Sequence, residues 1–158
     1  MKILMVCMGN ICRSPLAEGV VRRLAERAAM GAVIEVDSAG TLGYHAGEQP
    51  DPRARKVAAS RGYDLSGMRA RRVAEDDFAH FDLVLAMDRQ NLSALERVCP
   101  DEHLHKLRLF MDYAERGDID EIPDPYYGEP DGFERVLDLC EEAARGLIGS
   151  ISAARDRR

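Results

Sequence analysis

Residues 2–19, KILMVCMGNICRSPLAEG, decide the fold of this chain. The apolar run ILMV follows one lysine, a pattern typical of a strand that is buried on both faces of a parallel sheet. Ser14 and Pro15 then suit the N-cap and the first position of a helix. The stretch therefore predicts a buried strand, a short loop and a helix, in that order.

Strands and helices alternate along the rest of the chain. We expect the first helix to run to about Met30, with Gly31 as its stop. A second helix is expected to open at Asp51 and Pro52 and to close at Gly62. Further strands are predicted at residues 33–36, 82–87 and 106–110, and further helices at 89–98 and 133–151.

This alternation predicts one α/β domain over residues 1–158, built on a four-stranded parallel sheet with helices on both faces. We expect the strand order 2-1-3-4 of a flavodoxin-like or Rossmann-like sheet. Such sheets bind ligands at the carboxyl ends of their strands, and Cys7, Ser38 and Asp88 all fall at such ends. Three separate segments of the sequence are therefore expected to meet at one edge of the sheet.

The composition excludes several classes of function. With 158 residues and 46% hydrophobic content, the chain fits one domain with a sizeable core. Its net charge of −6 argues against nucleic acid and anionic membranes as partners. We find no apolar run long enough for a membrane span and no convincing signal peptide. The four cysteines are expected to be reduced thiols in the cytoplasm.

The loop at residues 8–13 lies between a predicted strand and a helix N-terminus, where backbone N–H groups form a cradle for anions. Gly9 permits the backbone angles that a tight loop needs. Arg13 offers a planar fork that matches two phosphate oxygens. Cys7 sits at the floor of this cradle, where the same field favours a nucleophilic thiolate. Ser14 is placed to donate a hydrogen bond to that sulfur.

Residues 111–132 form a long polar segment rich in Asp, Glu, Pro and Gly. Loops of this length inside compact domains are often functional. Expulsion of a phenoxide from phosphorus needs a proton donor, and Asp124 is the candidate. Tyr126 and Tyr127 follow it directly and would form aromatic walls for a flat aryl phosphate.

With these motifs in place, the chain resembles the low-molecular-weight protein tyrosine phosphatases. The matching segments, in family order, are CMGNICRS at 7–14 followed by PLAEG, DSAGT at 37–41, DPRA at 51–54, MD at 87–88 with Asn91, and DPYYG at 124–128. The resemblance implies that Cys7 attacks phosphorus, Arg13 binds the phosphate, and Asp124 acts first as acid and then as base. It implies a phosphotyrosine protein as substrate, phosphate as product and competitive ligand, and neither a metal nor a cofactor.

The resemblance also implies supporting roles. Ser38 would hold the phosphate loop together with Asn10 and Ser14. Apart from the resemblance, we expect Asp88 either to cap the following helix or to orient Arg13. Cys12 would be a second thiol that pairs with Cys7 under oxidation. The substrate site would comprise Met8, Gly9, Asn10, Ile11, Cys12, Ser14, Tyr44, Tyr126 and Tyr127.

Some features depart from the family or leave alternatives open. Met68 stands approximately where many relatives carry a histidine tied to the loop network. Protein arginine phosphatases on this scaffold typically have threonine at the position of Ile11, so Ile11 favours phosphotyrosine. Arsenate reductases need further cysteines that relay a disulfide, whereas Cys99 and Cys140 are far apart in sequence. A thiol redox sensor without catalysis is the alternative from another class.

Two further patterns are weaker evidence for a functional site. Cys99, His103 and His105 match no standard zinc spacing, so we expect no metal there. The basic run RARR at 69–72 is expected to be mainly a solvated face, with acidic residues of a substrate as the alternative. Whether Tyr126 or Tyr127 is itself phosphorylated is left open.

Overall fold

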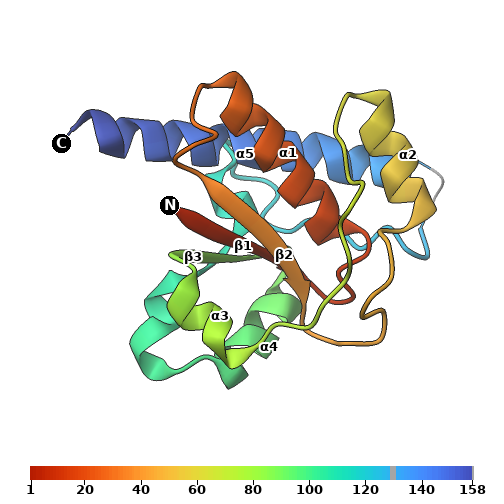
Figure 1. The fold of residues 1–158 in the computed structure, drawn as a ribbon, viewed down its shortest axis with the longest axis horizontal. Coiled ribbons are helices and arrows are strands. Elements are labelled where there is room, and N and C mark those ends of the chain that lie inside the picture. The colour runs from red at the N-terminus through yellow and green to blue at the C-terminus, as the bar shows by residue number, and fades with distance from the viewer. Residues whose placement is uncertain (129–130, 158) are drawn as a thin grey trace.

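A computed structural model describes residues 1–128 and 131–157, and its centre is a parallel sheet (Figure 1). The sheet consists of β1 (Lys2–Cys7), β2 (Glu35–Gly40), β3 (Leu83–Ala86) and β4 (Leu107–Leu109). The four strands are all parallel in the order β2-β1-β3-β4. The predicted α/β class and strand order are confirmed.

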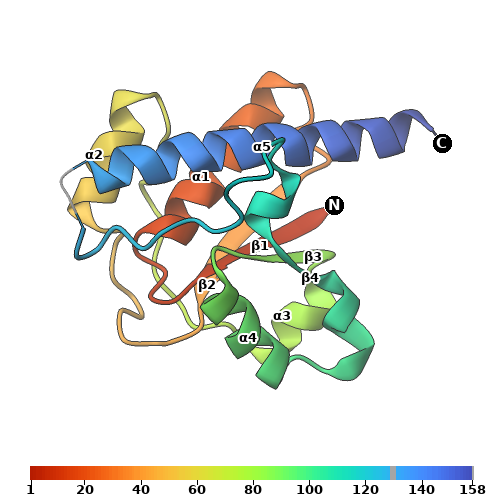
Figure 2. The same cartoon turned by 180° about the vertical axis from the view of Figure 1, so that it is seen from behind.

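Helices cover both faces of this sheet (Figures 1 and 2). They are α1 (Arg13–Arg27), α2 (Pro52–Ser60), α3 (Glu75–His80), α4 (Arg89–Val98) and α5 (Gly132–Asp156), with two 3₁₀ turns, η1 (Asp101–Lys106) and η2 (Phe110–Tyr113). The long helix α5 runs beside α1 and α2 on one face, whereas α3 and α4 lie on the other.

The alternation of side chains along β1 divides the core into two layers. Ile3, Met5 and Cys7 belong to the cluster that contains the apolar faces of α1 and α5. Leu4 and Val6 point the other way, into the cluster that contains Phe78 of α3 and Leu95 of α4. A strand of this kind is apolar at every position because both of its faces are buried. Cys7 therefore ends β1 on the face that α1 covers.

The predicted start and end of the first helix are wrong. Ser14 is not the N-cap: α1 begins at Arg13 after Cys12, which makes no side-chain capping bond. The Ser14 hydroxyl instead lies within hydrogen-bond distance of Cys7. The helix ends at Arg27 rather than Met30, because the chain turns at Ala29 in a left-handed conformation with a φ of 57°.

The second strand was also placed incorrectly. It covers Glu35–Gly40 rather than residues 33–36, so the turn-like sequence DSAG is the second half of β2. Its pairing with β1 continues to the partners Cys7 and Gly40, which keeps these residues extended. A Cβ atom at Gly40 would lie 2.7 Å from the carbonyl oxygen of Met8, so only glycine allows this approach of β2 to the phosphate loop.

The other predicted helices and strands are present, most of them with ends that differ by a few residues. Asp51 caps α2 and Gly62 follows it in a left-handed conformation, as expected. The closing helix is longer than the predicted 133–151, and α3 was not predicted at all. Within the long segment at 111–132, residues 129 and 130 lie outside the described residues.

Candidate active site

A cleft of about 410 Å³ opens at the carboxyl end of β1. Three stretches of chain far apart in sequence line it: the loop before α1, the loop after β2 and the DPYYG segment. The lining residues are Cys7, Met8, Gly9, Ile11, Cys12, Arg13, Leu42, Tyr44, His45, Asp124, Tyr126 and Tyr127. The predicted nucleophile, arginine and acid are thus brought together, whereas Asn10, Ser14, Ser38 and Asp88 stand behind this lining.

The Cys7 thiol is almost fully buried at the base of the cleft. Ser14 Oγ lies 3.0 Å from Cys7 Sγ, and the backbone N–H of Asn10 donates to the same sulfur at 3.3 Å. Both contacts come from the loop and first turn that the sequence assigned to anion binding. Donors arranged in this way stabilise a negative charge on sulfur.

Asn10 holds the loop in its unusual shape. Its backbone is left-handed, with a φ of 59°, a conformation that asparagine adopts more readily than most residues. Its side-chain NH₂ group donates to Ser14 Oγ at 2.9 Å and to Ser38 Oγ at 3.0 Å. Its amide oxygen accepts from the backbone N–H of Arg71 at 2.9 Å. The side chain is therefore fixed at both ends.

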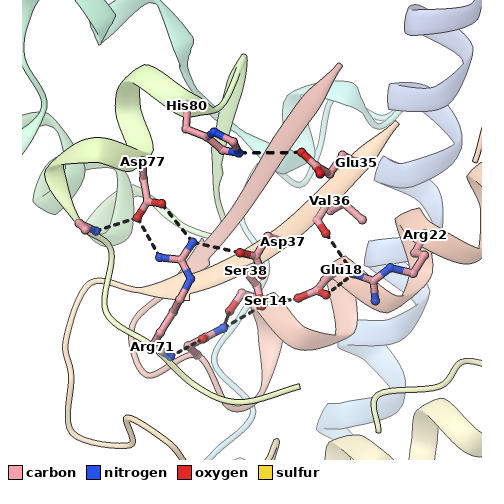
Figure 3. Close-up of polar contacts among 12 residues, drawn as sticks. Ser14, Glu18, Arg22, Glu35, Val36, Asp37, Ser38, Arg71, Asp77 and His80 are labelled. Atoms are coloured by element: carbon pink, nitrogen blue, oxygen red, sulfur yellow. Dashed lines mark hydrogen bonds and ion pairs between the residues drawn. The ribbon is translucent and has the colours of Figure 1, made fainter. Parts of the chain in front are cut away.

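Glu18 sets the direction of this hydrogen-bond chain. Its carboxylate accepts from the Ser38 hydroxyl at 2.7 Å and is paired with Arg22 at 2.5 Å (Figure 3). Because Ser38 must donate to Glu18, it can only accept from Asn10. Because Asn10 donates its second N–H to Ser14, the Ser14 hydroxyl is left to donate to Cys7. The Ser38 hydroxyl proton is thus directed to Glu18, and the Ser14 hydroxyl proton is directed to the Cys7 sulfur, where it stabilises a thiolate.

Burial of Glu18 raises its pKa, an effect that its contacts to Ser38 and Arg22 oppose. Met68 lines a second cavity, of about 350 Å³, together with Asn10, Glu18 and Ser38. The methionine therefore lies beside the network, as its sequence position suggested, but its thioether is only a weak acceptor. Serine, asparagine and glutamate carry the network.

Arg13 is buried, and its guanidinium is held through the Nη1 nitrogen. Its Nη1 donates to Asp88 Oδ2 at 2.6 Å and to the backbone carbonyl of Ile122 at 3.0 Å. Asp88 Oδ1 accepts from the backbone N–H of Asn91 at 2.7 Å and so caps α4. The two roles left open for Asp88 are therefore both present, one on each carboxylate oxygen.

Asp124 stands at the side of the cleft, with its side chain 40% exposed. Its Oδ2 lies 3.8 Å from Arg13 Nη2, and its Oδ1 accepts from the backbone N–H of Tyr126 at 3.0 Å. The rings of Tyr126 and Tyr127 meet edge to face with centroids 4.7 Å apart. Tyr44 and Tyr127 are 85% and 93% exposed, so the aromatic side chains form the outer rim.

The other cysteines have different surroundings. Burial, reinforced by the charge of Asp51, raises the pKa of Cys12 to about 12. Cys99 belongs to the core on the opposite face of the sheet. Burial raises the pKa of Cys140, which lies inside α5. All four thiols are free, and only Cys7 and Cys12 line the cleft.

The remaining sequence patterns are found away from the cleft. Arg71, within the RARR run, is not simply solvated: it donates to Asp77 at 2.9 Å and to Asp37 at 3.1 Å (Figure 3). In the described part of the chain no group of three or more His, Cys, Asp or Glu side chains is arranged to hold a metal ion. Over residues 1–128 and 131–157, no helix has the length and apolar character that a membrane span needs.

Sequence reasoning missed several parts of the site. Leu42 and His45 line the cleft beside Tyr44 without having been predicted. Glu18 lies in the PLAEG motif, but no role is predicted for it from the sequence. Its signal is the polar stripe Ser14, Glu18 and Arg22 at a spacing of four residues, on a helix whose other positions are largely apolar.

Comparison with known proteins agrees with this geometry. The family model described as low molecular weight phosphotyrosine protein phosphatase matches residues 2–157. A low molecular weight protein-tyrosine-phosphatase of Streptomyces coelicolor is 46% identical over 154 residues, which cover 95% of this chain and 93% of that protein.

Two solved structures extend the similarity. The protein tyrosine phosphatase of Entamoeba histolytica with Hepes in the active site has a TM-score of 0.94 and 41% identity, covering 98% of this chain and 99% of that one. Wzb of Vibrio vulnificus in complex with benzylphosphonate has a TM-score of 0.82 and 30% identity, covering 94% of this chain and 97% of that one. The chain therefore belongs to the low molecular weight phosphotyrosine protein phosphatase family.

Proposed function

We propose that this chain hydrolyses phosphotyrosine in proteins through a phosphocysteine intermediate and works in the cytoplasm. The observation that carries the proposal is the convergence of Cys7, Arg13 and Asp124 on one cleft with a tyrosine rim. The similar Wzb is found with benzylphosphonate, in which an aromatic ring is joined to a phosphonate much as in phosphotyrosine. Four free thiols agree with a reducing compartment.

In the first step, the Cys7 thiolate attacks phosphorus and the bond between phosphorus and the tyrosine oxygen breaks. Asp88 and Ile122 engage Nη1 of Arg13, so we expect Nε and Nη2 to bind two phosphoryl oxygens. Asp124 stands beside Nη2 and gives its proton to the leaving tyrosine oxygen. The products are phosphocysteine and the substrate protein with its tyrosine hydroxyl restored.

In the second step, water attacks phosphorus and the bond between phosphorus and sulfur breaks. Asp124, now ionised, takes the proton of the water. The Ser14 hydroxyl donates to the sulfur as its negative charge returns, which makes the thiolate a better leaving group. Phosphate departs, and the cycle balances with water as the second substrate.

The test is phosphate release from two peptides of one sequence, one with phosphotyrosine and one with phosphoarginine. We expect release from phosphotyrosine that is abolished in Cys7→Ser and retained in Cys99→Ser, since Cys99 lies on the opposite face of the sheet. A preference for phosphoarginine would overturn the substrate class. Release that survives in Cys7→Ser would overturn the nucleophile.

A further inference from the structure

Arg53, in the first turn of α2, has a half-exposed side chain whose guanidinium nitrogens all make hydrogen bonds. Its Nε and Nη2 donate to the two carboxylate oxygens of Asp51 at 3.0 and 2.9 Å. Its guanidinium lies over the rings of Tyr126 and Phe133, at 5.2 and 4.7 Å from their centroids. The remaining nitrogen, Nη1, donates to the backbone carbonyl of Tyr126 at 3.1 Å.

Tyr126 joins this arginine to the proposed general acid. The carbonyl of Tyr126 accepts from Arg53, whereas its N–H donates to Asp124 Oδ1 at 3.0 Å. The backbone of one residue is therefore fixed by Arg53 on one side and fixes Asp124 on the other. The other carboxylate oxygen, Oδ2, is the one nearest Arg13.

Asp51 ties the same arginine to the phosphate loop. The backbone N–H of Asp51 donates to the carbonyl of Ile11 at 2.8 Å, and its carboxylate receives the fork of Arg53. Asp51 also caps α2, so its position is set by the helix. A continuous path of hydrogen bonds thus runs from Ile11 through Asp51, Arg53 and Tyr126 to Asp124.

We propose that Arg53 is a positioning residue that holds the Asp124 loop in register with the phosphate-binding loop. The inference rests on the proposed function, because it assigns Arg53 an effect on the acid and not on the nucleophile. An arginine is required, since a planar fork is needed to grip a carboxylate, to donate to a carbonyl and to stack on two rings at once. A lysine ammonium is a point charge and cannot meet all three geometries.

The experiment compares kcat/KM for two small substrates in the parent and in Arg53→Met. The leaving group of p-nitrophenyl phosphate departs easily without a proton, whereas that of phenyl phosphate depends on the acid. We expect the variant to lose on the order of 10-fold more activity on phenyl phosphate than on p-nitrophenyl phosphate, a fraction of the roughly 10²–10⁴-fold that a general acid supplies. Near-parent activity on p-nitrophenyl phosphate also shows that the variant is folded.

Three comparisons separate positioning from other roles. Lys56→Met, on the exposed part of the same helix, is expected to keep the parent ratio of the two substrates. Arg53→Lys is expected to remain impaired on phenyl phosphate. In an Asp124→Asn background, Arg53→Met is expected to cause no further loss on phenyl phosphate, because the group that it positions is gone.

Equal losses on both substrates, a parent-like ratio in Arg53→Lys, or a full additional loss in the Asp124→Asn background would each overturn the inference while leaving the proposed function intact. A parent chain that releases no phosphate from either substrate would instead overturn the proposed function, and the inference with it.

Discussion

Arg13 Nη1 lies 2.6 Å from Asp88 Oδ2 in a largely buried ion pair that joins the start of α1 to the start of α4. The two helices lie on opposite faces of the sheet. The pair spans the edge where β1 and β3 end, and it turns the guanidinium toward the cleft. The orientation of Arg13, the arginine proposed to bind phosphate, therefore depends on a residue that also caps a helix.

The two tasks of Asp88 can be separated by substitution. Asp88→Asn keeps an oxygen for the α4 cap but removes the negative charge beside Arg13. We expect kcat/KM to fall by on the order of 10²-fold, as is typical when a reacting group is misplaced. Asp88→Ala should show the same loss and, in thermal melts, a further destabilisation of about 1 kcal/mol from the lost cap. Parent-like activity in Asp88→Asn would contradict the role in orientation.

Glu18→Gln tests the direction of the hydrogen-bond chain. Gln keeps the size of the side chain but no longer forces the Ser38 hydroxyl to donate, so the alignment that ends at Cys7 weakens. We expect kcat/KM to fall on the order of 10-fold, somewhat less than when a direct donor to the reacting atoms is removed. Glu26→Gln, an exposed change on the same helix, is the matched control and should have no effect.

The same variant should show a pH-dependent difference in stability. Burial raises the pKa of Glu18 above its ordinary value of 4.5, so the folded chain binds this proton more tightly than the unfolded chain. Its contribution to stability is present below pH 4.5 and is lost as the pH rises through the raised pKa. Melting temperatures measured from pH 4 to pH 8 should therefore shift in favour of Glu18→Gln as the pH rises. A constant difference would contradict the raised pKa.

Gly146 in α5 allows η2 to approach the helix closely. A Cβ atom there would lie 1.7 Å from the carbonyl oxygen of Tyr113, so Gly146→Ala should destabilise the fold by about 1–3 kcal/mol through overpacking. Gly149 lies in the same helix, and a Cβ atom there meets nothing within 4 Å. Gly149→Ala should instead stabilise the fold by up to about 1 kcal/mol through helix propensity. Urea unfolding of both variants measures the contrast, and changes of the same sign would contradict it.

Cysteine labelling is expected to be selective. Burial raises the pKa of Cys12 to about 12, and it also raises the pKa values of Cys99 and Cys140. These three side chains are therefore neutral thiols at pH 7 and react slowly with iodoacetate. We expect mass spectrometry to find carboxymethylation at Cys7 first, and phosphate to slow the reaction. Labelling of Cys12 as fast as Cys7 would contradict the assignment.

The strand order, and the meeting of the candidate site residues at one edge of the sheet, could be predicted from the sequence because both follow from local patterns. A continuous apolar run marks β1, and the carboxyl ends of parallel strands share one edge, so Cys7 and Asp88 had to lie near each other. The loop before a helix predicted an anion cradle, and Cys7 does receive contacts from Asn10 and Ser14 there.

Other features could not be predicted because they depend on contacts between distant segments. The sequence DSAG has the composition of a turn, but pairing with β1 holds it extended. Ser14 has the character of a helix cap, but a thiol seven residues earlier takes its hydroxyl. The partners of Glu18 and Arg53 that matter, Ser38 and Tyr126, are distant in sequence and reach them only in the folded chain.

The proposed nucleophile and the proposed acid are far apart in the chain. Cys7 ends the first strand, whereas Asp124 lies in the last loop before the closing helix. During synthesis, the ribosome releases the cysteine, the arginine and both serines long before it has made the acid. In the proposed mechanism, general-acid catalysis therefore becomes available only after the loop that carries Asp124 has been made. A chain that stops short of this loop would hold the proposed nucleophile and arginine but would lack the proposed acid.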